Sequence, residues 1–270
     1  MTARRGSTAR HSTARRLLPI VAAAALFLGA TALAGPPAKR RKAPPYPTMV
    51  QGWHTPSPSA QPPVDDEGHP LLILQALNST DRGAFPAAGP RGGFSAQDLD
   101  LAAAILHDPS SGNRNPVEPR LLDLVFRIQT HFHAEEIRVL SGYRTPARSG
   151  ASNHGKGRAI DFVVPGATDA DVATFARTLG FVGVGIYPVS GFVHLDVRDR
   201  SYFWSDASGP GRKNRERGIL GDLAKSSDRE AALRGEVPVS TCALQFDVDA
   251  ALRACAAGES TTDDDDEPGD

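Results

Sequence analysis

The sequence has almost no excess of either charge. Its 30 Lys and Arg residues balance 31 Asp and Glu residues, so the formal net charge is -1. Proteins that bind nucleic acid through its phosphates usually carry a basic surplus. The short basic cluster at 39–42 is interpreted as a solvated stretch that could touch anionic envelope polymers. The sequence therefore predicts no nucleic-acid partner.

A long apolar run is also lacking. Residues 17–33 are apolar, but this stretch is short for a transmembrane helix. It ends in Ala32-Leu33-Ala34, which has the small residues of a cleavage site, and it is preceded by Arg4, Arg5, Arg10, Arg15 and Arg16. We interpret residues 1–34 as a signal peptide cut after Ala34, with an uncleaved anchor as the alternative. The mature protein is expected in the periplasm or cell envelope, without a stable membrane span.

Cysteine is scarce, since Cys242 and Cys255 are the only two in the chain. No cysteine lies directly after the apolar stretch, which argues against a lipoprotein. In an exported protein, a disulfide between Cys242 and Cys255 is expected in preference to a metal or redox site.

Composition divides the remainder of the chain. Residues 35–70 are rich in Pro, Ser and basic residues without apolar periodicity, and we interpret them as a flexible linker. A folded domain is expected over 71–206. Residues 207–258 form a C-terminal extension with room for one or two helices, and 259–270 form an acidic tail that is expected to be disordered.

Periodicity within 71–206 indicates an α+β domain. We expect a small antiparallel sheet with a metal site on one face and helices packed on the other. Ser95 and Asp98 have the spacing of a helix N-terminal cap, and Leu99, Leu101 and Ala102 begin an apolar stripe behind them. The expected elements are a strand from Leu71, a loop over 83–94, helices over 95–108, 119–132 and 169–179, strands over 136–144 and 159–164, and a hairpin that turns at 189–191.

A carboxylate interrupts the strand predicted over 159–164. Ile160, Phe162 and Val164 share one face of this strand, whereas Asp161 points from the other. A buried carboxylate needs a cation, a hydrogen-bond donor or a metal, because removing a charge from water costs several kcal/mol. Something positive should therefore face Asp161.

A second strand repeats the pattern. In GFVHLDV, from Gly191 to Val197, His194 and Asp196 point away from the apolar face. His154 lies in a loop that Gly155 and Gly157 allow to turn back toward the strand. Two histidines and one carboxylate, His154, Asp161 and His194, predict a zinc site with a fourth position open. His131 and His133 diverge at a helix end and are not expected to bind the metal.

Four motifs in order resemble a known superfamily. They are SGYRTP from Ser141, SNHGKGRAIDF from Ser152, GVGIYPVSGFVHLDV from Gly183, and Tyr202 to Trp204. Together they resemble the zinc D-Ala-D-Ala carboxypeptidase superfamily, and within it the YcbK-like branch of murein endopeptidases. The resemblance implies a hedgehog/D-Ala-D-Ala peptidase-like fold, a zinc cofactor and peptidoglycan peptides as substrate.

The resemblance also implies roles for residues around the metal. Arg144 would contact substrate and stabilise charge in the transition state, with a surface ion pair as the alternative. Gly191 and Phe192 stand where many relatives carry a Glu or a His that moves a proton. Asp196 is therefore the candidate general base, and the alternative is that it orients a ligand histidine.

Two functions follow from this pattern. The first is an exported zinc-dependent peptidase that hydrolyses peptidoglycan stems or cross-links, as an endopeptidase or a carboxypeptidase. The alternative, motivated by Gly191 and Phe192, is a module that retains zinc and binds the cell wall or a partner without catalysis. The sequence leaves the stereochemistry of the scissile bond and the oligomeric state open.

Overall fold

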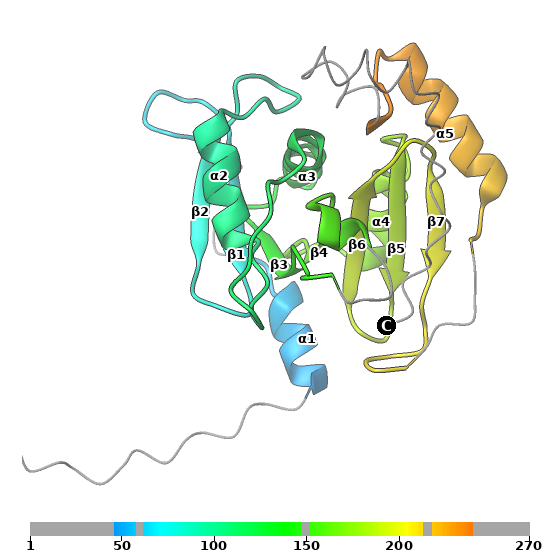
Figure 1. Cartoon of the computed structure of the whole chain (residues 1–270), viewed down its shortest axis with the longest axis horizontal. Coiled ribbons are helices and arrows are strands. Elements are labelled where there is room, and N and C mark those ends of the chain that lie inside the picture. Colours follow the sequence, from blue (N-terminus) through cyan, green and yellow to red (C-terminus); the bar gives the residue numbers. More distant parts are fainter. Residues whose placement is uncertain (1–45, 58–61, 147–151, 213–217, 240–270) are drawn as a thin grey trace, which may run out of the picture. The chain divides into compact units, whose positions relative to one another are not determined.

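The computed structural model describes residues 46–57, 62–146, 152–212 and 218–239, which Figure 1 shows in colour. The predicted signal peptide, both cysteines and the acidic tail lie outside these residues. The helices are α1 (Tyr46–His54), α2 (Ala96–Ile105), α3 (Pro119–His131), the 3-10 turn η1 (Asn153–Lys156), α4 (Asp169–Ala176) and α5 (Gly221–Leu233). The strands are β1 (Leu71–Ala76), β2 (Arg82–Pro86), β3 (Ile137–Ser141), β4 (Ala159–Val163), β5 (Val182–Tyr187), β6 (Phe192–Val197) and β7 (Tyr202–Ser205).

In the described part of the chain, seven strands form one mixed sheet in the order β2-β1-β3-β4-β6-β5-β7. Four neighbouring pairs are antiparallel, but β1 runs parallel to β3 and β5 runs parallel to β7. The α+β class is confirmed, whereas the expected small antiparallel sheet is wrong in both size and strand direction. Periodicity identifies the buried face of a strand but not its neighbours in the sheet. Here the chain passes through β2, α2 and α3 before β3, which lets β3 return beside β1 in the same direction.

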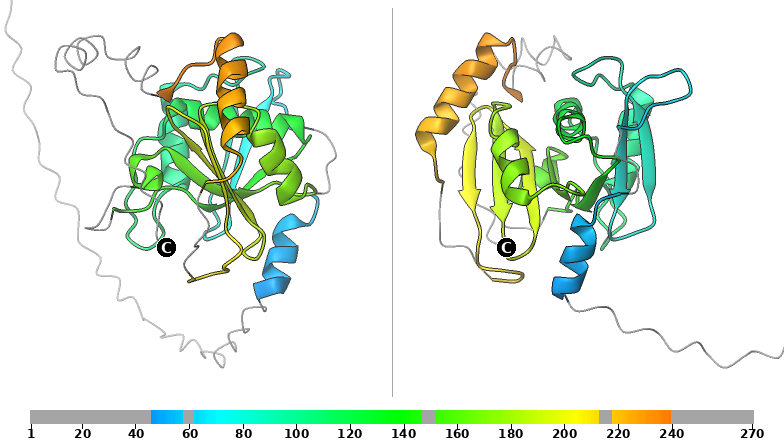
Figure 2. Two further views of the ribbon diagram at one scale, coloured as in Figure 1. Left: turned by 90° about the vertical axis from the view of Figure 1, so that its right-hand side faces the viewer. Right: turned by 180° about the vertical axis from the view of Figure 1, so that it is seen from behind.

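One face of the central strands carries the core. Ile160 and Phe162 of β4 and Leu195 of β6 are fully buried in a cluster that includes residues of α3 and α4. The view from behind in Figure 2 shows α4 in front of β5 and β6, the two strands that it contacts. Burial stabilises the fold by about 1.5–3 kcal/mol for each large apolar side chain. The predicted alternation leaves Asp161 and His194 on the opposite face.

The helices before the site begin where the sequence predicts. The Ser95 hydroxyl accepts a hydrogen bond from the Asp98 N–H, and the Asp98 carboxylate accepts one from the Ser95 N–H. This reciprocal cap starts α2 at residue 96. Pro119 begins α3, whose buried apolar side chains face β1. Leu101 is the exception to the predicted α2 stripe, because its side chain is 52% exposed.

Part of the predicted flexible linker is folded. Within 35–70, residues 46–54 form α1, and the Tyr46 hydroxyl donates a hydrogen bond to the Ser190 carbonyl. His54 Nε2 lies 3.0 Å from Asp169 Oδ1. Arg138 of β3 donates to the carbonyls of Gly52, Trp53 and Thr55 at the end of α1. Contacts with distant segments hold this helix in place. The linker is predicted from its lack of apolar periodicity, and such a local pattern carries no information about distant contacts.

Two further segments, the expected loop over 83–94 and the C-terminal extension, contain regular secondary structure. The loop expected over 83–94 is wrong at its start, because residues 82–86 pair with β1 as the edge strand β2. Backbone hydrogen bonds to a neighbouring strand do not require apolar side chains at every other position. The C-terminal extension contains α5, as its composition allows. Among the residues that the structure describes, none of the helices has the length and apolar character needed to span a bilayer.

Candidate metal centre

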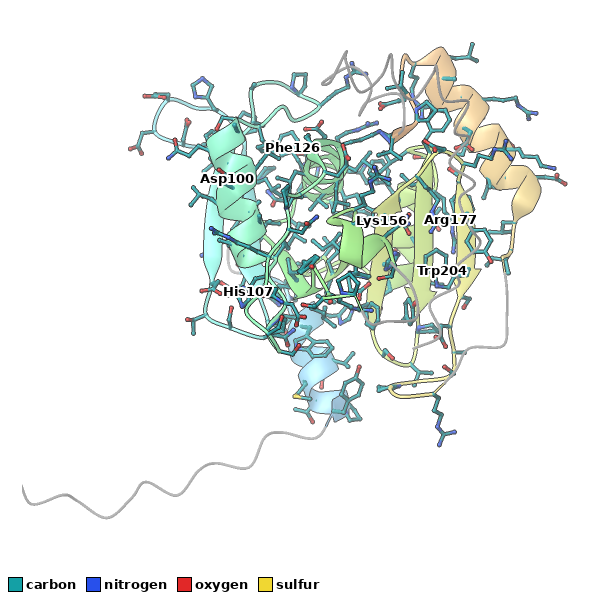
Figure 3. The ribbon with its side chains drawn as sticks, in the orientation of Figure 1. Asp100, His107, Phe126, Lys156, Arg177 and Trp204 are labelled. Carbon is teal, nitrogen blue, oxygen red and sulfur yellow. The ribbon has the colours of Figure 1, made fainter. Side chains whose placement is uncertain are left out.

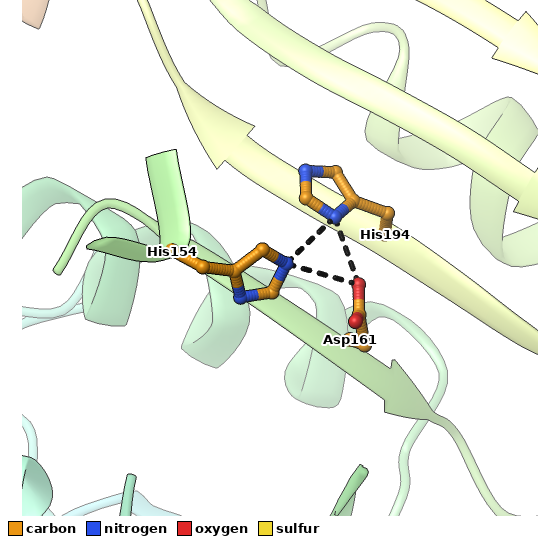
Figure 4. Close-up of side chains that lie close together, drawn as sticks. All are labelled: His154, Asp161 and His194. Carbon is orange, nitrogen blue, oxygen red and sulfur yellow. Dashed lines mark hydrogen bonds and ion pairs between the residues drawn. The ribbon is translucent and has the colours of Figure 1, made fainter. Parts of the chain in front are cut away.

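Three predicted ligands meet at one place in the structure, and Figure 4 shows their side chains pointing toward one another. His194 Nδ1 lies 2.8 Å from Asp161 Oδ1 and 3.2 Å from His154 Nε2. His154 Nε2 lies 3.5 Å from the same Asp161 oxygen. All three side chains are buried. One atom from each residue therefore points to a common centre.

Strand register places two of these residues together. Asp161 in β4 is the direct antiparallel partner of His194 in β6. Side chains at such positions leave the same face of the sheet with their Cβ atoms about 4.5–5.5 Å apart. A slip of one residue would turn His194 toward the core, but Val193 and Leu195 are fully buried on the core side and fix the register.

The turn η1 supplies the third residue. Gly157 ends η1 with a φ of 69°, in the left-handed region, and its N–H faces the carbonyls of Asn153 and His154. A Cβ at this position would lie 2.1 Å from the Pro116 carbonyl oxygen, so glycine is the residue that fits. The turn contacts both β4 and β6 and holds His154 over Asp161.

Hydrogen bonds at the outer ring nitrogens orient both histidines. His154 Nδ1 lies 2.6 Å from the Gly142 carbonyl oxygen, which can only accept, so this nitrogen carries the proton. His194 Nε2 lies 2.9 Å from Asp196 Oδ2 and donates to that carboxylate. The inward nitrogens, His154 Nε2 and His194 Nδ1, are then the ones that can offer a lone pair to a metal.

The spacing of the three inward atoms fits a tetrahedral metal. Ligand atoms at about 2.0–2.1 Å from a tetrahedral zinc are separated from each other by about 3.3 Å. The three separations here, 2.8, 3.2 and 3.5 Å, lie around that value. Two imidazoles and one carboxylate are also a common donor set for catalytic zinc, in which a fourth position stays open. Small side-chain adjustments would let these residues hold the ion.

Mutual contacts shift the pKa values of the cluster. Burial disfavours ionisation of Asp161, but His154, His194 and Arg144 outweigh burial and hold the Asp161 pKa well below its usual range. Burial also lowers the pKa of His194, yet hydrogen bonds from its ring to Asp161 and Asp196 raise it to about 9. The two carboxylates therefore favour a protonated His194, and a metal would have to displace that proton from Nδ1.

Arg144 lies at the rim of the cluster. Its Nη2 donates to Asp161 Oδ2, and its Nε donates to the Ser141 hydroxyl at 2.9 Å. The Arg144 side chain is 39% exposed, whereas that of Asp161 is 4% exposed. Arg144 therefore engages the carboxylate oxygen that faces away from the two histidines and still reaches the surface.

Asp196 lies behind His194 and is almost completely enclosed. Besides the ring of His194, it accepts hydrogen bonds from Arg198 Nε at 2.6 Å and Arg198 Nη2 at 2.8 Å. Its exposed fraction is 1%, and burial is outweighed by Arg198 and His194, so the Asp196 pKa is far below its usual range. The structure thus places Asp196 against a predicted ligand, and both of its oxygens are engaged.

The sequence prediction assigned no role at the site to three groups that lie around it. Arg198 and the Gly142 carbonyl hold Asp196 and His154, respectively. The ring of Trp204, labelled in Figure 3, lies 5.0 Å from the ring of His194. The alternating glycines of β5 are a sequence feature that could have indicated this packing. A Cβ at Gly183 would lie 2.3 Å from Asp196, and one at Gly185 would lie 2.3 Å from Trp204. Alternating glycines in a strand can mark such a close approach.

The other histidine pair stays away from the centre. His131 ends α3, and its ring stacks on Phe175 at 3.6 Å between centroids, as a packing residue. Among the described residues, one more group could hold a metal, formed by Asp65, Glu67 and His69. Its Glu67 and His69 are exposed, and exposed acidic groups often cluster in this way without an ion.

Comparison with known proteins assigns the family. A family model described as peptidoglycan L,D-endopeptidase MepK matches residues 84–201. A probable peptidoglycan L,D-endopeptidase MepK of Haemophilus influenzae is 32% identical over 142 residues, which are 47% of this chain and 75% of that protein. The chain belongs to the MepK family. The superfamily and branch inferred from the four motifs are confirmed.

Other MepK relatives are more distant. The peptidoglycan L,D-endopeptidases MepK of Escherichia coli K12 and Shigella flexneri are each 29% identical over 117 residues. The aligned parts are 39% of this chain and 64% of each relative. No solved structure matches the chain. The MepK segment at 84–201 contains the three converging residues, Arg144 and Asp196, whereas α1 and α5 lie outside it.

Proposed function

We propose that the chain is a zinc-dependent peptidase that hydrolyses L,D amide bonds in peptidoglycan peptides. The convergence of His154 Nε2, Asp161 Oδ1 and His194 Nδ1 in a member of the MepK family carries this proposal. Its relatives are named peptidoglycan L,D-endopeptidases. The similarity to these enzymes supports catalysis over the alternative of a zinc-retaining module that only binds the cell wall.

The three converging residues would hold zinc with one tetrahedral position open. An ion held in this way polarises a carbonyl group and lowers the pKa of water, which is the chemistry that amide hydrolysis needs. The protein contributes the orientation of the ligands. The Gly142 carbonyl keeps the proton of His154 on Nδ1, and Asp196 keeps the proton of His194 on Nε2.

Arg144 is proposed to stabilise negative charge on the scissile carbonyl oxygen. Its partly exposed guanidinium reaches the surface beside Asp161, so a substrate amide over the metal would lie within its range. A guanidinium that faces developing negative charge in a partly dehydrated site can lower the activation free energy by several kcal/mol. This proposal keeps the role implied by the superfamily resemblance and adds the ion pair with Asp161.

Asp196 is proposed as a positioning residue for His194 and not as the general base. A general base needs an oxygen that can receive a proton from water or substrate. Both Asp196 oxygens accept hydrogen bonds from Arg198, and Oδ2 also accepts one from His194. The residue is also 1% exposed. Of the two roles considered from the sequence, these contacts support the orientation of a ligand.

The cell envelope is the proposed location. Residues 1–34 have the pattern of a secretory signal peptide, and peptidoglycan lies beyond the inner membrane. The named function of the MepK relatives agrees with a cell-wall substrate.

Digestion of defined peptidoglycan fragments tests the proposal. The purified protein is incubated with muropeptides that contain either an L,D or a D,D amide bond, and products are identified by mass spectrometry. We expect cleavage of the L,D bond that stops with a chelator and returns with zinc. Cleavage of only the D,D bond would overturn the assignment of the scissile bond. A lack of any zinc-dependent product would overturn the proposal that the chain is a peptidase.

A pair of histidine variants provides the control. His194→Ala should lose both bound zinc and cleavage, because it removes a ligand. His131→Ala also removes an imidazole, but one that stacks on Phe175 at the end of α3, so it should keep both properties. Equal losses in the two variants would indicate general misfolding and contradict the assignment.

A further inference from the structure

The loop at 142–145 touches two of the three proposed ligands. The Gly142 carbonyl accepts a hydrogen bond from His154, and Arg144 pairs with Asp161. The position of this loop therefore sets where the Gly142 carbonyl and the Arg144 guanidinium lie. The loop follows β3 and has no regular secondary structure of its own, so other segments must hold it.

The end of α2 and the turn behind it hold this loop at both sides of Arg144. The Tyr143 N–H donates to the Leu106 carbonyl at 2.7 Å. On the other side, the Thr145 N–H donates to Asp108 Oδ2 at 3.0 Å. Figure 3 marks the turn by the label of His107, which precedes Asp108. Arg144 is thus the residue between two anchored backbone amides.

Asp108 connects this turn to the loop through its two oxygens. Oδ1 accepts hydrogen bonds from the Ser110 N–H at 2.9 Å and the Ser110 hydroxyl at 2.6 Å, which closes the turn itself. Oδ2 accepts from the Ser111 hydroxyl at 3.0 Å as well as from Thr145. Ser111 Oγ in turn lies 2.8 Å from Thr145 Oγ1. Asp108 is 8% exposed, so water competes little for these bonds.

We infer that Asp108 is a positioning residue of the peptidase, which acts by fixing the loop that carries Arg144. This inference rests on the proposed function. Asp108 belongs to the segment between α2 and α3, has no assigned part in metal binding, and reaches the site through Thr145. A displacement of about 1 Å in a charge-stabilising group can reduce turnover by about 100-fold.

The variant Asp108→Asn tests this role because it changes few atoms. One amide oxygen can still close the turn onto Ser110, but the amide nitrogen cannot accept the Thr145 N–H. We expect kcat to fall by about 10-fold to 100-fold, with a smaller change in KM and unchanged zinc content. In an Arg144→Ala background the same change should reduce kcat by less than about 3-fold, because the group that Asp108 positions is gone.

Asp65→Asn is the matched control. Asp65 Oδ1 also accepts two backbone N–H groups, from Glu67 and His69, but all of its partners belong to its own turn. Asp65→Asn should leave kcat unchanged. Equal kcat values for the two variants would overturn the inference.

A measurement on Arg144 itself separates this inference from the proposed function. Hydrogen exchange of the Arg144 Nε–H, followed by NMR, should be slow in the unchanged protein and at least about 10-fold faster in Asp108→Asn. If the protein cleaves no peptidoglycan but this exchange changes, the proposed function fails and the positioning contact stands. If exchange is unchanged, the inference fails. Ser111→Ala, which removes the hydroxyl that faces Thr145 Oγ1, gives a milder test if Asp108→Asn does not fold.

Discussion

Asp161 and His194 lie directly opposite each other on neighbouring antiparallel strands, with His194 Nδ1 2.8 Å from Asp161 Oδ1. Each strand buries its apolar side chains on the other face, so the pairing cannot slip without exposing the core. The same register that closes the core therefore brings together two of the three residues of the candidate metal centre. His154 completes it from a turn that depends on Gly157.

Removing the charge of Asp196 should weaken zinc binding. Asp196→Asn places an amide beside His194 Nε2, and an amide that donates there would favour the tautomer with a proton on Nδ1. Loss of such an orienting partner typically reduces metal affinity by about 10-fold to 100-fold. Competition with a fluorescent chelator measures the dissociation constant.

A distant histidine–carboxylate pair controls for the loss of charge. His54 Nε2 lies 3.0 Å from Asp169 Oδ1, on elements apart from the metal centre. Asp169→Asn should leave the zinc affinity unchanged. If Asp196→Asn also binds zinc as tightly as the unchanged protein, the positioning role of Asp196 is wrong.

Adding one methyl group at Gly183 should disturb the same carboxylate. A Cβ there would lie 2.3 Å from Asp196 Oδ2, whereas one at Gly89 would have no neighbour within 4 Å. Overpacking of this kind costs about 1–3 kcal/mol of unfolding free energy. Gly183→Ala should therefore lower both stability in urea and zinc affinity, and Gly89→Ala should change neither. Unimpaired zinc binding by Gly183→Ala would show that Asp196 can move without consequence.

Zinc binding should release a proton over a defined pH range. The metal-free protein holds the pKa of His194 at about 9, above the ordinary 6.5, because Asp161 and Asp196 stabilise the charged ring. Zinc requires a lone pair on Nδ1, so binding near pH 7.5 should release about one proton from His194. The release should decline as pH rises through about 9. Calorimetric titration in buffers of different ionisation enthalpy measures the number of protons.

The same pKa predicts how the stability of the metal-free protein depends on pH. The folded-state pKa is higher than that of the unfolded chain, so folding is favoured by proton binding. The contribution of His194 is fully present below pH 6.5 and is lost as pH rises through about 9. Urea unfolding of chelator-treated protein between pH 6 and 10 should show this decline. The His194→Gln variant should lack it, and an identical decline in that variant would contradict the assignment.

The docking of α1 should depend on one guanidinium. Arg138 Nη1 donates to three carbonyls near the end of the helix, at 2.8 to 3.2 Å. Arg138 Nε also donates to Glu136 at 2.9 Å, and the single ammonium group of lysine cannot reach both this carboxylate and the carbonyls of α1. Arg138→Lys should accelerate hydrogen exchange of the α1 amides, because hydrogen bonds from a charged group contribute about 1.5–3 kcal/mol. Arg82→Lys, which alters the ion pair of the exposed Arg82 side chain with Glu136, should leave α1 protected.

Local sequence was sufficient for α2, α3 and α4 and for the two faces of β4 and β6. The Ser95 and Asp98 cap, Pro119 at the start of α3 and the alternation around Asp161 all act within a few residues along the chain. Such short-range patterns also predicted that His154, Asp161 and His194 converge, because a buried carboxylate on an apolar strand needs a partner.

Interactions between distant segments determined the features of the fold and of the site that local sequence did not predict. The mixed strand directions, the helix in the predicted linker and the contact of Arg144 with Asp161 depend on residues that are far apart in the sequence. The surroundings of Asp196 have the same origin, since Gly183 must leave room for a carboxylate on the neighbouring strand. Residue types and spacing can show that a charged group needs a partner. The identity of that partner depends on the tertiary structure, because folding determines which groups lie within contact distance and which are removed from water.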